Sequence, residues 1–151
     1  MKNLIITLFI AIGCVSFTKG FGQSEKLKKA ENIINEKLKK FSDEGTKDDY
    51  WQIKILENGN IEQYYGSQKL SYNLNNIDSI KYVFVEGKHI VRICCKGGSN
   101  CIRNYIGEEI ENEDYWDYMS FNIISKAEAE NLIKELNNLK LIIPKNIPTN
   151  E

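Results

Sequence analysis

The chain has 151 residues, of which 42% are hydrophobic and 27% charged, and its 20 basic and 21 acidic side chains leave a formal net charge of −1. This balance argues against a nucleic-acid partner, because nucleic-acid-binding domains concentrate positive charge. The length suits one domain with a substantial core, and no shift in composition marks a second one.

The first 22 residues have the pattern of a secretory signal peptide. Lys2 precedes an apolar run over residues 4–15, which has the length of a signal-peptide core and is too short to span a bilayer. Gly20 and Gly22 place small residues at the −3 and −1 positions of a cleavage site. We therefore predict that residues 1–22 are removed, that the protein is periplasmic or secreted, and that no transmembrane helix remains.

A lipid anchor is an alternative to that cleavage. The stretch Ala11-Ile12-Gly13-Cys14 resembles the lipobox of bacterial lipoproteins, in which the cysteine becomes the lipidated first residue. Ala11 stands where that family prefers leucine, and apolar Val15 and Phe17 follow where a polar tether is usual. The resemblance implies lipidation at Cys14, and both readings imply export.

Residues 23–48 are predicted to form an N-terminal amphipathic helix and a linker. Apolar side chains recur at helical spacing among lysines and glutamates, namely Leu27, Ala30, Ile34, Leu38 and Phe41. The segment 42–48 is polar and is predicted to be a loop.

Residues 49–143 are predicted to be a single antiparallel β domain with a C-terminal helix. Apolar and polar residues alternate from Tyr50 to Leu56, and Asn58-Gly59 follows, a dipeptide that tolerates the positive φ angles of a tight hairpin. About seven strands are expected along the domain. The segment Ile80–Val85 is apolar on both faces, so we expect it to lie centrally in its sheet.

The C-terminal helix has both a start and a stop signal. Ser125 and Glu128 have the spacing of a capping box, and Pro144 forbids continuation. The expected buried stripe comprises Ala129, Leu132, Ile133, Leu136 and Leu139. Residues 144–151 form a tail.

This order of elements resembles the pleckstrin-homology-like barrel, in which a terminal helix closes the open end of an antiparallel barrel. The resemblance covers about residues 49–140 and is one of element order, without a diagnostic motif. It implies an α+β fold with a barrel or strongly bent sheet and a C-terminal capping helix. Lipocalin-like and other helix-on-sheet folds remain alternatives. Phosphoinositide binding is not implied, since the first hairpin loop, Glu57–Asn60, lacks basic residues.

Three cysteines lie within eight positions, at Cys94, Cys95 and Cys101. His89 and Cys95 would be roughly 20 Å apart on an extended strand, which is too far for shared zinc ligation, and adjacent cysteines face opposite sides. A redox pair is disfavoured because no helix start is expected nearby. In an exported chain we predict a structural disulfide between Cys95 and Cys101 on facing strands, with Cys94 as the alternative partner.

Aromatic residues stand beside carboxylates at two places. Tyr50 and Trp51 open the first strand, and Tyr115 and Trp116 lie in an acidic stretch before the last one. These four side chains form a possible ligand patch, because rings supply apolar area and carboxylates supply direction. Alternation also makes Trp51 a candidate for the core. The single histidine, His89, is expected to be a polar surface residue.

No catalytic residue, cofactor or metal site is assigned, because no catalytic motif accompanies these features. The leading hypothesis is a non-enzymatic exported domain of the envelope that binds a protein, a peptide or a small amphipathic ligand. The first alternative is a structural or inhibitory envelope protein without a small-molecule site, and the second is a hydrolase that uses carboxylates of the acidic loops. A cavity of roughly 300 Å³ or more with convergent polar groups would favour ligand binding.

Overall fold

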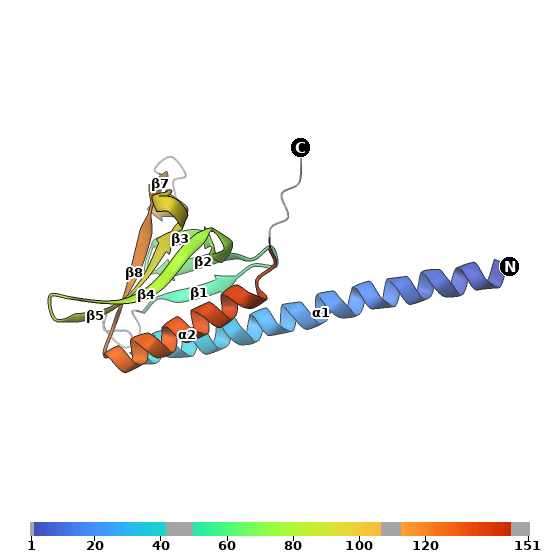
Figure 1. The fold of residues 1–151 in the computed structure, drawn as a ribbon, viewed down its shortest axis with the longest axis horizontal. Coiled ribbons are helices and arrows are strands. Elements are labelled where there is room, and N and C mark those ends of the chain that lie inside the picture. Colours follow the sequence, from blue (N-terminus) through green and yellow to red (C-terminus); the bar gives the residue numbers. More distant parts are fainter. Residues whose placement is uncertain (1, 42–49, 107–112, 146–151) are drawn as a thin grey trace.

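The computed structural model describes residues 2–41, 50–106 and 113–145 (Figure 1). Over these residues the elements are α1 Lys2–Phe41, β1 Gln52–Ile55, β2 Asn60–Tyr65, β3 Gln68–Asn73, the 3-10 turn η1 Leu74–Asn76, β4 Ile77–Val85, β5 Lys88–Cys95, the 3-10 turn η2 Lys96–Gly98, β6 Ile102–Ile106, β7 Glu113–Trp116, β8 Tyr118–Ile123 and α2 Lys126–Ile142. The predicted α+β class is confirmed, with one helix before the strands and one after them.

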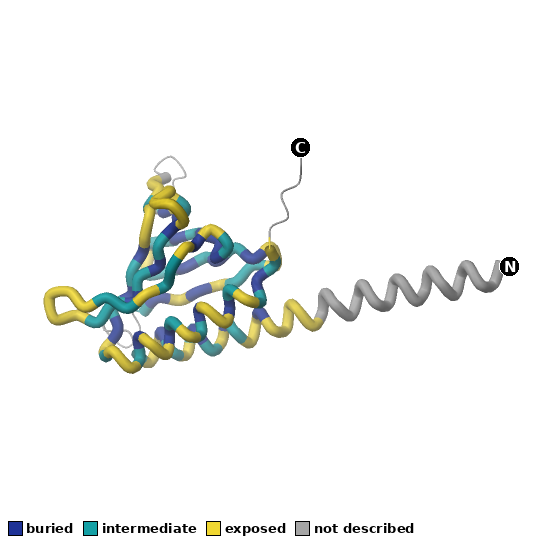
Figure 2. Tube along the Cα trace, viewed as in Figure 1, coloured by how far each residue is buried: buried dark blue, intermediate teal, exposed yellow. Residues whose placement is uncertain are grey.

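The described strands form two open antiparallel sheets that do not close into a barrel. The first has the order β1-β2-β3-β6-β7 and the second the order β4-β5-β8. The prediction that Ile80–Val85 lies centrally is wrong, because this segment belongs to β4 at an edge. The tip of the β4–β5 hairpin extends away from the rest of the domain (Figure 2). The apolar residues near its turn are therefore exposed, Phe84 by 58% and Val85 by 42%.

The predicted hairpin turn at Asn58-Gly59 is confirmed. Gly59 has a φ of +82° and joins β1 to β2, and its N–H donates to the carbonyl of Leu56 at 2.9 Å. A Cβ atom at this position would approach Cγ2 of Ile143 to 2.7 Å. Glycine is therefore required here both by the backbone conformation and by the close packing of the segment that follows α2.

The helices bury the stripes that their sequence spacing predicts. In α1, Leu27, Ile34 and Leu38 are buried, and Ala30 and Phe41 pack partly against the core. In α2, Ile133 is partly buried, and the fully buried members of the stripe are Ala129, Leu132, Leu136 and Leu139. The hydroxyl of Ser125 accepts a hydrogen bond from the N–H of Glu128, and α2 ends at Ile142, before Pro144. Figure 1 shows α2 lying along α1.

Helix α1 covers the outer edge of β1 with polar side chains. The amide of Asn35 accepts from the N–H of Ile53 at 2.7 Å and donates to its carbonyl at 2.8 Å. Two residues further along the strand, the carboxylate of Glu31 accepts from the N–H of Ile55 at 2.7 Å. These bonds replace the neighbouring strand that an edge lacks, and they explain why Glu31 is buried.

The predicted disulfide between Cys95 and Cys101 is present, with a Cα–Cα distance of 5.7 Å. Its setting differs from the facing hairpin strands that we expected. β5 belongs to the three-stranded sheet and β6 to the five-stranded sheet, so the bond joins two sheets where η2 carries the chain between them. Cys94 is a free, half-buried cysteine, as expected for the residue that faces away.

Loss of the disulfide is expected to lower the free energy of unfolding by roughly 2 kcal/mol, because the bond closes a loop of only a few residues and restricts the unfolded chain little. Chemical denaturation with and without a reductant measures the change. The double variant Cys95→Ser, Cys101→Ser should be as unstable as the reduced protein and insensitive to reductant, whereas Cys94→Ser should keep the sensitivity. An equal response of all three proteins would contradict the assignment.

Candidate functional site

A groove of about 480 Å³ lies where the chain passes from the five-stranded to the three-stranded sheet. β7 pairs with β6, β8 pairs with β5, and only Asp117 separates β7 from β8. The groove is lined by one residue of the loop before β6 and by six consecutive residues from the end of β7 to the middle of β8: Asn100, Tyr115, Trp116, Asp117, Tyr118, Met119 and Ser120. We refer to it as the corner groove.

Contacts around the disulfide hold the corner groove in place. The carbonyl of Asp117 accepts a hydrogen bond from the N–H of Cys95 at 2.8 Å, so the bend between β7 and β8 is tied to the end of β5. Sγ of Cys95 lies 3.6 Å from the carbonyl oxygen of Trp116. The disulfide therefore braces the two segments that change sheets, in addition to joining β5 to β6.

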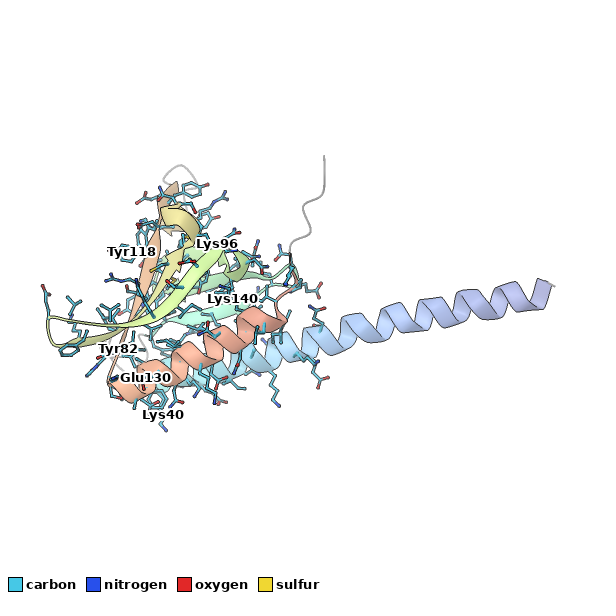
Figure 3. The ribbon with its side chains drawn as sticks, viewed as in Figure 1. Lys40, Tyr82, Lys96, Tyr118, Glu130 and Lys140 are labelled. Atoms are coloured by element: carbon cyan, nitrogen blue, oxygen red, sulfur yellow. A yellow bond between two sulfur atoms is a disulfide. The ribbon has the colours of Figure 1, made fainter. Side chains whose placement is uncertain are left out.

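The aromatic side chains of the groove are oriented by charged neighbours. The indole N–H of Trp116 donates to a carboxylate oxygen of Asp114 at 2.9 Å. The guanidinium of Arg92 lies 4.6 Å from the centre of the Tyr118 ring, which is 47% exposed. Figure 3 shows Tyr118 at the same end of the molecule as Lys96, with Tyr82 near the start of α2. Cation–π contacts of this kind fix a ring while leaving its other face open to a ligand.

Two polar atoms beside the corner groove have no hydrogen-bond partner in the part of the chain that the structure describes. These are the hydroxyl oxygen of Ser120 and Nε of Arg92, both of which are buried as atoms. Arg92 and Ser120 are directly opposite in the β5–β8 register, so their side chains share one sheet face. Buried polar groups are normally paired, and such an exception next to a groove indicates a place for an additional partner.

The structure divides the predicted aromatic patch. Trp51 is 8% exposed and belongs to the core, where it lies edge-on to Phe121. Tyr50 is partly buried against the same core. Tyr115 and Trp116 line the corner groove, on β7. Because β1 and β7 are opposite edges of the five-stranded sheet, the two pairs do not form one patch.

His89 is half-buried near the start of β5. Its Nδ1 lies 2.9 Å from the hydroxyl of Tyr82, and the rings of Tyr82 and Phe84 flank it. Within the described residues, no group of three or more histidine, cysteine, aspartate or glutamate side chains is arranged to hold a metal ion. Of the acidic stretch Glu108–Asp114, residues 108–112 lie outside the described residues, as does the predicted linker loop 42–48, whereas Glu113 and Asp114 lie on β7.

A buried polar cluster inside the five-stranded sheet was not anticipated. Gln63 and Asn104 are both completely buried, and the hydroxyl of Tyr72 donates to Oε1 of Gln63 at 3.1 Å. The amide of Gln68 donates to Oδ1 of Asn104 at 3.0 Å. Burial raises the pKa of the Tyr72 phenol, so the phenol stays a neutral donor. In the sequence, Gln63 shares the strand face of Ile61 and Tyr65, but this spacing alone does not show that its amide is buried.

A charge cluster on the opposite face of this sheet centres on Glu62. Lys69 Nζ lies 2.6 Å from one carboxylate oxygen, and the hydroxyl of Tyr64 donates to the other at 2.5 Å. Hydrogen bonds from Lys69 and Tyr64 lower the pKa of Glu62 below its usual 4.5. Burial and the bond to Glu62 raise the pKa of Tyr64 to about 12.

Glu62→Gln is expected to lower the free energy of unfolding at pH 7 by about 1 kcal/mol, because a charge-assisted pair becomes neutral. The carboxylate has a lower pKa in the folded state, so its contribution is present above pH 4.5 and disappears as the pH falls through the folded pKa. Denaturation curves between pH 3 and 7 should therefore converge for the two proteins in acid. A difference independent of pH would contradict this origin.

Comparisons of the chain with known protein families, with curated proteins and with solved structures find no match. Over the residues that the structure describes, no helix has an apolar stretch long enough to cross a membrane.

Proposed function

We propose that the protein is an exported, non-enzymatic binding module whose ligand occupies the corner groove. The observation that carries the proposal is the groove itself, because its volume of about 480 Å³ combines three aromatic side chains with the polar groups of Asn100, Asp117 and Ser120. Clefts of this size with a few convergent polar groups are typical of ligand sites. This favours a binding module over a structural or inhibitory protein without a small-molecule site.

The disulfide supports the exported location, since such bonds persist in oxidising compartments. The leader pattern over residues 1–22 supports export by cleavage, and lipidation at Cys14 remains the alternative route. The pleckstrin-homology-like resemblance remains a proposal about the fold. We expect an amphipathic ligand, because the groove combines aromatic rings with the polar atoms of Ser120 and, beside it, Arg92, which favours a molecule that has both kinds of surface.

A screen of small aromatic amides by ¹⁵N-resolved NMR tests this function. Ligands are expected to shift the backbone signals of residues 115–120. Tyr118→Ala should weaken their binding by about tenfold or more, because an exposed stacking ring is lost. Phe84→Ala is the matched control, since Phe84 is an exposed aromatic residue at the far end of the same sheet. No shifts at residues 115–120, or equal losses in both variants, would contradict the proposal.

A further inference from the structure

The corner groove runs along a free sheet edge. β8 is the last strand of the three-stranded sheet, with β5 on one side and no strand on the other within the described chain. Apart from Asn100, the groove is lined by six consecutive residues, 115–120, so it follows the backbone of this segment. A groove between side chains of distant elements would not have this lining. An extended chain segment fits a groove of this shape, because it would lie parallel to the edge.

The pairing of β5 with β8 determines which backbone groups face this edge. The N–H of Cys95 donates to the carbonyl of Asp117, and in an antiparallel pair such bonded positions recur at every second residue. Met119 and Phe121 therefore direct their backbone groups towards β5. Tyr118 and Ser120 direct theirs away from it, towards the free edge, and neither forms a backbone bond to another strand of the described residues there.

Two positively charged side chains share the sheet face on which Ser120 lies. Lys81, Arg92 and Ser120 are opposite one another in the registers of β4, β5 and β8 and share the sheet face away from the core. No carboxylate of the described residues forms an ion pair with Arg92, whose Nε also lacks an acceptor. The hydroxyl of Ser120, on the edge strand, also has no hydrogen-bond partner among the described residues.

We propose that an extended peptide segment bearing a glutamate or aspartate side chain adds to β8 as a fourth strand of this sheet. Its backbone bonds to Tyr118 and Ser120, and its carboxylate accepts from Ser120 and Arg92. The carboxylate-bearing residue lies opposite Ser120, two strand spacings or roughly 10 Å from Arg92, a gap that the two long side chains span. This inference rests on the proposed function, because it assigns a ligand class to the same groove.

The test measures the binding of the blocked hexapeptide acetyl-Thr-Val-Glu-Val-Thr-Lys-amide to the full chain by calorimetry and NMR. Its glutamine analogue is expected to bind about tenfold more weakly, because one charge-assisted contact is lost. Arg92→Gln should weaken binding of the glutamate peptide by a similar factor and leave binding of the glutamine peptide unchanged, as a double-mutant cycle requires for a direct pair. Arg92→Lys should retain most of the binding, and Lys88→Gln, on the same face near the hairpin tip, should have no effect.

Two methylated peptides test the strand geometry. One carries an N-methyl group on the glutamate and the other on both valines, so that alternate edges of the peptide backbone are blocked. Strand addition predicts that one of the two loses measurable binding and the other retains it, because only one edge faces β8. Equal binding of both would overturn the proposal.

The remaining outcomes separate this inference from the proposed function. If aromatic amides shift the backbone NMR signals of residues 115–120 and the peptide does not bind, strand addition is wrong and the groove remains a small-ligand site. If neither probe shifts them, both proposals fall. If sedimentation shows self-association with changes at Tyr118 and Ser120, and the peptide does not compete, the edge pairs with a second copy of the chain and the peptide proposal is overturned.

Discussion

Phe121→Ala is expected to lower the free energy of unfolding by about 4 kcal/mol, the largest effect of any substitution considered. Phe121 is 1% exposed, on the core face of β8, and its ring meets the ring of Trp51 edge-on at a centroid distance of 6.4 Å. Trp51 directly precedes β1 of the other sheet. Truncation therefore opens a cavity at the junction of the two sheets and removes an aromatic contact as well.

Urea denaturation followed by tryptophan fluorescence measures this loss. The melting temperature is expected to fall by roughly 15 °C or more for a domain of this size. Phe84→Ala is the control, because that ring is 58% exposed and its removal should change stability by less than about 0.5 kcal/mol. Similar losses for the two variants would show that Phe121 does not join the sheets.

Asn35→Ala is expected to lower the free energy of unfolding by about 3 kcal/mol. The substitution removes both hydrogen bonds between this side chain and the backbone of Ile53, which is 3% exposed. Water cannot easily replace them there, so an N–H and a carbonyl are left buried without partners, at a cost of about 1–3 kcal/mol each. The hydrophobic stripe of α1 is untouched, which separates this loss from a loss of packing.

Hydrogen exchange locates the effect of this substitution. The amide of Ile53 should exchange faster in Asn35→Ala, while the amide of Ile55 keeps its bond to Glu31 and should change less. Asn32→Ala, at an exposed position of the same helix, is the matched control and should leave both amides and the stability unchanged. Uniform acceleration across the domain would argue against a local edge role.

Features that depend on a few neighbouring residues could be predicted from the sequence. The stripes of α1 and α2 follow from helical spacing, the Asn58-Gly59 turn from the positive φ that glycine tolerates, and the start of α2 from the hydroxyl of Ser125. The disulfide also belongs here, since adjacent Cys94 and Cys95 must face opposite sides of a strand. Each of these depends on backbone geometry over at most a few turns or strand positions.

Features that depend on strand partners could not be predicted in this way. The apolar segment Ile80–Val85 was expected at the centre of a sheet, but it lies in the edge strand β4. This edge strand carries apolar residues on both faces, because α2 contacts β4 and the tip of the β4–β5 hairpin extends past the helix. Gln63 and Asn104 interrupt apolar alternation with buried amides. Their burial follows from neighbours on other strands, which no local pattern specifies.

The corner groove combines both kinds of information. The residue order alone places Tyr115 and Trp116 beside carboxylates and identifies them as candidates for binding, whereas Tyr118 joins them only in the folded structure. It also places Tyr50 and Trp51 in the same class, and only the order of the strands separates the two pairs onto opposite edges. The sequence by itself thus determines the local turns, helix faces and residue types of this protein. The free edge of β8 and the position of Arg92 beside it are decided only by the tertiary structure, because burial and hydrogen-bond satisfaction depend on residues distant in the chain.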